Sequence, residues 1–186
     1  FTSRQLLDEV AESIERAVRF SSDESTLKNA IVRARFILEE EPQSFTVEYG
    51  PDSSFVLPSQ KYPSKEELSA VELDKFLDSK KKLNKKFLKI SELEDGNKEI
   101  DFNVKILGIG LIQQQELLTD FEPSIYFYPT GEKDPSVVFL ATEEEVLALY
   151  IAPFSGKIER IYHTIENNND DDINDIQIEI AQNIFE

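Results

Sequence analysis

The sequence contains no cysteine, no methionine and no tryptophan, and its only histidine is His163. Without cysteine there is no disulfide bond, no thiolate zinc ligand and no cysteine nucleophile. Any catalytic triad has to use the single imidazole, and a zinc site would have to be completed by carboxylates. These absences exclude thiol chemistry and make histidine chemistry depend on one side chain.

Long apolar runs and a signal-peptide pattern are also missing, so the sequence predicts no membrane partner. The absence of methionine, with Phe1 as first residue, leads us to expect a trimmed or processed segment. A chain without cysteine suits a reducing compartment. The expected location is therefore the cytoplasm, although a segment before Phe1 would change that expectation.

Positive charge is scarce: 37 acidic residues face 20 basic ones, for a formal net charge of −17 on 186 residues. The 40% hydrophobic content is enough for a packed core, so the chain is not a disordered acidic tail. A field of this sign attracts cationic surfaces and repels nucleic acid. We expect a basic protein partner and no nucleic acid, and the oligomeric state is left open.

One segment runs against that charge, since residues 80–89 contain six lysines and no acidic residue. With Phe87 beside them, these lysines have the composition of a phosphate contact. The opposing field of the whole molecule favours a solvated face instead, and the asymmetry also suits an oriented docking to a protein.

Apolar residues at three- and four-residue spacing predict helices over residues 6–18 and 27–38, separated by a capping-box break at Ser21–Glu24. These two stripes would form an N-terminal helical hairpin. A strand is expected over residues 45–49. A capping box at Ser64–Glu67 predicts a middle helix, which should change to a strand near Asn84.

The pattern of residues 86–164 predicts mainly antiparallel sheet. The expected strands cover residues 87–90, 100–106, 125–128, 137–140, 146–151 and 157–163. Asp95-Gly96 predicts a hairpin turn, a short helix is expected near residues 113–118, and Thr142 with Glu145 suggests one helical turn. Apolar spacing over residues 173–184 predicts a closing helix.

The sequence therefore predicts an α+β fold with an N-terminal helical hairpin, a middle helix, a mainly antiparallel β-sheet and a C-terminal helix. Residues 1–42 would be the hairpin and residues 43–186 the α+β domain, the two forming one compact unit.

None of the motifs identifies a reaction. His163 ends a predicted strand and Ser155 sits in a turn that lacks a nucleophile elbow. Gly108-Ile109-Gly110 lacks the rest of a phosphate loop and favours a strand bulge. Residues 168–179 resemble an EF-hand register, but Ile173 stands where glycine makes the turn. We predict no catalytic residue, no metal ligand and no cofactor.

Acidic clusters are the best candidates for binding residues. The set predicted to contact a partner is Glu143, Glu144, Glu145, Asp170, Asp171 and Asp172. Charge and the lack of a reactive motif favour a non-catalytic protein-binding domain, namely an inhibitor or immunity protein or an acidic adaptor. Two alternatives stay open: a structural domain of a secretion, phage or envelope complex, and a carboxylate- and metal-dependent hydrolase using acids such as Asp101, Glu144 or Asp170.

The segment from Val137 onward, with a hairpin before Ile161-Tyr162-His163 and the ending Ile178-Glu179-Ile180-Ala181-Gln182-Asn183-Ile184-Phe185, resembles the end of SUKH immunity proteins. The resemblance covers about a quarter of the chain, and the family's N-terminal Leu-Pro-x-x-Tyr pattern is not matched. It implies a closing strand, an acidic loop and an amphipathic helix, and it assigns no site residue.

Overall fold

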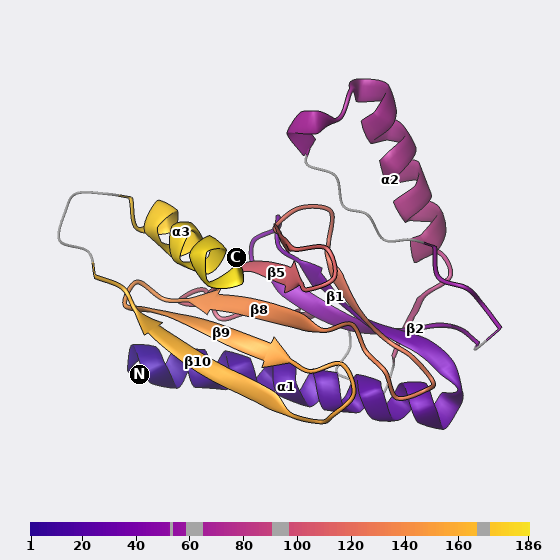
Figure 1. Ribbon diagram of the computed structural model, residues 1–186, viewed down its shortest axis with the longest axis horizontal. Coiled ribbons are helices and arrows are strands. Elements are labelled where there is room, and N and C mark those ends of the chain that lie inside the picture. Colours follow the sequence, from indigo (N-terminus) through magenta and orange to yellow (C-terminus); the bar gives the residue numbers. More distant parts are fainter. Residues whose placement is uncertain (53, 59–64, 91–96, 167–171) are drawn as a thin grey trace.

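The computed structural model has N-terminal, middle and C-terminal helices with antiparallel sheets, which confirms the α+β class. It describes all residues except 53, 59–64, 91–96 and 167–171. Helix α1 runs beneath the sheets, α3 covers part of their other side, and α2 projects at the opposite end of the molecule (Figure 1).

Helix α1 spans Ser3–Lys28 without a break. Thr2 is its N-cap, and its side chain accepts a hydrogen bond from the backbone N of Gln5 in a capping box. The expected break at residue 21 is wrong because the serines there bond backward inside the helix. Ser21 Oγ donates to the carbonyl of Ala17 at 2.6 Å, so its hydroxyl has a hydrogen-bond partner within the helix and the helix continues.

The second helix of the expected hairpin is a strand. Helix α1 ends at Asn29, which adopts φ 50°, and β1 follows directly as Ala30–Ile37. Both faces of β1 are covered, so apolar residues occur on each face and fit a helical spacing as well as a strand. Burial on both faces therefore accounts for the wrong prediction.

The strands form two antiparallel sheets. Sheet A has the order β3-β2-β1-β7, with β4 also paired to β2, and sheet B has the order β10-β9-β8-β5-β6. The strand bounds are β2 Ser44–Asp52, β3 Leu88–Lys89, β4 Lys98–Glu99, β5 Lys105–Leu111, β6 Glu116–Leu118, β7 Ser124–Phe127, β8 Ser136–Ala141, β9 Glu145–Ile151 and β10 Ile158–Thr164.

The core is layered. One apolar cluster lies between α1 and the facing sides of both sheets, and includes Leu7, Ile14, Phe36, Ile109 and Leu147. A second cluster lies between sheet B and helix α3 (Ile173–Phe185), and a small third one joins sheet A to the end of α2. Because the first cluster contains residues of both sheets, α1 ties sheet A to sheet B.

The middle region differs in detail from the expectation. A short 3-10 helix covers Lys65–Glu67, and α2 spans Ala70–Asn84 with Ser69 as its N-cap. Ser64 and the Asp95-Gly96 turn lie outside the described residues. Helix α2 ends at Asn84, as predicted, but β3 and β4 both pair with β2 rather than with each other.

Sheet B confirms three of the expected strands, as β8, β9 and β10, and corrects two helices. The strand expected over residues 100–106 is wrong for most of its length, because residues 101–104 form a turn and β5 begins only at Lys105. Residues 112–115 are turns followed by β6, not a helix, and residues 142–144 form a tight turn between β8 and β9. The register of β5 shifts between Ile106 and Gly108, so the predicted bulge is confirmed. A domain boundary at residue 42 stays a prediction.

Candidate functional site

The surface at the N-terminal end of α1 contains a hollow of about 670 Å³, which we call the end hollow. It lies between the start of α1, the loop before β5, the β8–β9 turn and the start of α3. The lining residues are Phe1, Ser3, Leu6, Phe102, Asn103, Lys105, Ala141, Thr142, Glu143, Glu144, Ile173, Asn174 and Gln177.

Hydrogen bonds hold the elements that form the end hollow. The hydroxyls of Ser3 and Thr142 are 2.5 Å apart, which ties α1 to the β8–β9 turn. Gln177 Nε2 donates to the carbonyl of Thr142 at 2.8 Å, and Lys105 Nζ donates to Asn174 Oδ1 at 2.6 Å. The Thr142 hydroxyl also accepts bonds from two backbone amides of the turn. The framework of the end hollow is therefore fixed in place.

An aromatic side chain stands free at this end hollow, because Phe102 is 90% exposed. The residue lies in the turn that precedes β5, and Asp101 Oδ1 anchors that turn by accepting from the backbone N of Asn103 at 2.9 Å. The half-buried Leu6 and Ile173 add apolar surface nearby. Exposed apolar surface gathered in a hollow with a polar rim is typical of a protein contact.

Part of the predicted acidic set meets at the end hollow. Glu143 and Glu144 line it, and Asp172 is the N-cap of α3, whose next residues form one wall. Glu145 is engaged elsewhere, in an ion pair with Arg4 at 2.6 Å. Asp170 and Asp171 lie outside the described residues. That Glu143 and Glu144 contact a partner stays a prediction.

A polar clamp fixes α1 to the edge strand β10. Arg160 Nε donates to Glu15 Oε2 at 3.0 Å, and Arg160 Nη1 lies 3.2 Å from Asp8 Oδ1. The Tyr162 hydroxyl donates to the same Asp8 oxygen, and the Arg4 guanidinium stacks 3.6 Å from the centre of the Tyr162 ring. The hydrogen bond to Glu15 raises the pKa of Arg160, so the charged guanidinium is stabilised by its contact with α1.

A second charged cluster is buried on the face of sheet A beside the end of α2. Arg33 is fully buried, and its Nε donates to Glu48 Oε1 at 2.7 Å. Phe87 lies over the guanidinium at 4.0 Å, and Arg35 Nη2 reaches Glu48 Oε2 at 3.5 Å. Among the described residues, Arg33 Nη2 has no hydrogen-bond partner. The burial of Arg33 and its bond to the Glu48 carboxylate indicate that this cluster supports the fold.

Lys80 of α2 is half-buried above this cluster. Burial, and after it the charge of Arg33, lowers its pKa to about 8; Glu122 opposes this shift, and Arg35 adds the smallest contribution to it. At pH 7 the folded protein therefore holds a lysine whose charged form is disfavoured relative to the unfolded chain.

Replacing Lys80 by methionine is expected to raise the free energy of unfolding at pH 7. Between pH 8 and the ordinary lysine pKa of 10.5 the unfolded chain binds more protons, so wild-type stability should rise with pH. The gain from Lys80→Met should then shrink by pH 10. Urea titrations of both proteins at pH 7 and pH 10 measure this; an equal gain at both pH values would contradict it.

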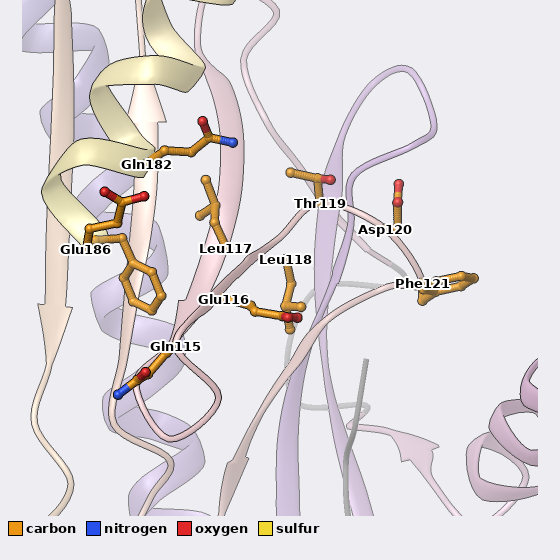
Figure 2. A pocket seen from close by; sticks show the side chains of 10 residues that line it. Gln115, Glu116, Leu117, Leu118, Thr119, Asp120, Phe121, Gln182 and Glu186 are labelled. Atoms are coloured by element: carbon orange, nitrogen blue, oxygen red, sulfur yellow. The ribbon is translucent and has the colours of Figure 1, made fainter. Parts of the chain in front are cut away.

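A smaller hollow of about 470 Å³ lies beside β6 and the end of α3 (Figure 2). Leu117 and Gln182 face it from the two elements, and Glu116, Asp120 and Glu186 add carboxylates around it. The Phe185 ring also lines this hollow, and it packs edge-on against Phe139 at 6.3 Å between ring centres. This hollow brings together none of the predicted binding residues.

Reactive groups do not converge among the described residues. No group of three or more His, Asp or Glu side chains there could hold a metal ion. His163 lies in β10 with Nε2 buried and unbonded, and Ser155 contributes its carbonyl to Lys133 Nζ at 2.8 Å. Of the EF-hand-like register, Asn168 and Asp170 lie outside the described residues. Among the residues that the structure describes, no helix combines the length and apolar character needed to cross a membrane.

Sequence reasoning missed two features. Phe102 was placed in an alternating strand, where its apolar character predicts burial, but it stands exposed in the turn before β5. Arg33 and Glu48 are 15 residues apart and face each other across the β1–β2 register. Opposite charges inside two apolar strands are the signal that points to such a pair.

No family model and no curated protein matches the chain, so the resemblance to SUKH immunity proteins finds no support. Two solved structures are similar, and both are of the minor pseudopilin EpsH from the type 2 secretion system of Vibrio cholerae. The first has 12% sequence identity and a TM-score of 0.48, and the match covers 83% of this chain and 94% of that chain. The second has 14% identity and a TM-score of 0.45, and the match covers 86% of this chain and 94% of that chain. The expectation of an inhibitor, immunity or adaptor protein is wrong on this finding, since both are secretion-system components.

Proposed function

We propose that this chain is a structural subunit of a larger protein assembly, such as a secretion complex. The observation that supports this function is the end hollow, which the exposed Phe102 lines together with the half-buried Leu6 and Ile173 on a hydrogen-bonded framework. Covering a water-exposed aromatic ring at a preorganised hollow by a neighbouring subunit is favourable, because apolar surface is removed from water.

The way the molecule is braced suits that role. Helix α1 joins both sheets through one core, and the clamp of Arg160 with Glu15 and Asp8 fixes it laterally. A subunit with such bracing presents its end hollow with little conformational freedom, and preorganisation lowers the entropy lost on association. For the partner's chemistry, the acidic rim at Glu143 and Glu144 favours a basic protein surface.

The test is replacement of Phe102 by serine in the full-length protein in its native host. We expect the chain to move from a defined multi-protein complex to a monomer on native mass spectrometry, with its free energy of unfolding within about 0.5 kcal/mol of wild type. Phe154→Ser is the matched control, because Phe154 is 74% exposed in a different turn, between β9 and β10.

The proposal fails if wild type is a monomer in the host, or if both serine variants leave the complex intact. Retention of the complex by Phe154→Ser alone, at normal thermal stability, is the supporting result.

A further inference from the structure

We propose that the partner at the end hollow is a second copy of this chain, docked by its lysine-rich end. This inference rests on the proposed structural function and names the partner of the same site. It follows from the chain carrying two complementary surfaces, one acidic and hollow, the other basic.

The basic surface, which we call the lysine end, lies at the end of α2 and in β3. It consists of the exposed residues Lys81, Lys82, Lys85, Lys86, Leu88 and Lys89. Leu88 is 71% exposed and stands between Lys86 and Lys89 in sequence. An exposed apolar side chain flanked by lysines has the chemistry to enter a hollow with apolar walls and a carboxylate rim.

The acidic surface matches it in kind. Glu143 and Glu144 occupy the tip of the β8–β9 turn, while Phe102 and Ile173 provide apolar contact. Lys105 is bound to Asn174 at 2.6 Å, so the one lysine of the lining is already engaged by a neighbour. Leu88 of one copy would pack against Phe102 of the next, with Lys86 and Lys89 facing the two glutamates.

The two surfaces lie at opposite ends of the molecule. In Figure 1 the start of α1 and the β8–β9 turn are at the left, and the end of α2, where it meets the sheets, is at the right. Contact between unlike surfaces on opposite ends is heterologous, and each added copy leaves a new free surface for the next. The structure thus supports a head-to-tail row of copies rather than a closed two-fold dimer.

Net charge opposes this association and sets the conditions of the test. Copies that each carry −17 repel one another at long range. At an ionic strength of about 0.15 M the Debye length is about 8 Å, so distant charges are screened and pairs in contact keep most of their attraction. Association should therefore be weakest in dilute salt and strengthen toward physiological salt, before contact pairs are screened as well.

The experiment is a charge exchange followed by sedimentation velocity at about 0.15 M salt. One variant is Lys86→Glu with Lys89→Glu, and the other is Glu143→Lys with Glu144→Lys. Each alone should self-associate at least about tenfold more weakly than wild type, because like charges then meet. An equimolar mixture should associate again, because the reversed lysine end of one matches the reversed end hollow of the other.

Two variants of equal net charge are the controls: Lys28→Glu with Lys75→Glu, and Glu9→Lys with Asp23→Lys. All four positions are exposed and line neither surface. Both controls should associate like wild type.

Three results overturn the inference: a wild-type chain that stays monomeric to about 1 mM, controls that weaken association equally, or a mixture that does not recover. If the purified wild type is monomeric but still enters a host complex through Phe102, only the identity of the partner is overturned. If the wild type also forms no complex in the host, the proposed function is overturned.

Discussion

Replacing Glu48 by glutamine is expected to lower the free energy of unfolding by about 3–5 kcal/mol, the largest loss we expect from one isosteric change. Arg33 is fully buried and bonds Glu48 through Nε at 2.7 Å. Without the carboxylate its charge stays in the interior uncompensated. Equilibrium urea unfolding followed by circular dichroism measures the loss.

A nearby pair provides the control. Glu122 is 42% exposed and lies 3.7 Å from Arg35 Nε, so Glu122→Gln should cost less than about 1 kcal/mol. The two variants remove the same charge from the same network and differ in burial. Equal losses would show that burial of the Arg33–Glu48 pair does not set its energetics.

A double variant separates the net contribution of the ion pair to stability from the cost of leaving one of its charges unpaired. Arg33→Met with Glu48→Met removes both charges and keeps apolar volume against Phe87, which now lies over the guanidinium at 4.0 Å. Its stability should lie within about 1 kcal/mol of wild type or exceed it, because no charge of the buried pair is left unpaired and Arg35 keeps Glu122 at 3.7 Å. A double variant as unstable as Glu48→Gln would mean that the pair itself stabilises the fold.

The sequence predicted elements of two kinds. Helix α3 and the first part of α1 pack on one side and show the helical period. Strands β8 and β9 are buried almost throughout, and they were predicted because they are short apolar runs bounded by turn residues, with β10 completing the second hairpin. Strand β1 was missed because its two covered faces blur the period of two. The pairing of β3 and β4 with β2 was missed because non-local register leaves no mark on local composition.

The candidate site was predictable only in part. Charge density pointed to Glu143 and Glu144, and both line the end hollow. The same reasoning included Glu145, which an ion pair with Arg4 engages, because sequence does not show which acids meet a cation. The hollow itself depends on loops from four elements meeting at one end, a property of the tertiary structure alone.

A methyl group added at Gly50 should lower the free energy of unfolding by about 3 kcal/mol, the upper end of the cost of overpacking a core. The Cβ of Gly50→Ala would lie 2.4 Å from Phe87 Cε1 and 2.9 Å from the carbonyl oxygen of Ile31. A shift of the ring would disturb its stacking on the Arg33 guanidinium, and the carbonyl belongs to strand β1. Both ways of relieving the clash therefore disturb sheet A.

Gly156→Ala is the matched control, since its Cβ would meet nothing within 4 Å, and its stability should stay within about 0.5 kcal/mol of wild type. Shortening the ring in Gly50→Ala with Phe87→Leu should recover part of the loss, measured as coupling in a double-mutant cycle. Purely additive effects in that cycle would contradict the clash with Phe87. The remaining cost would then come from the Ile31 carbonyl, which lies where the β1–β2 register shifts between Ala30 and Val32.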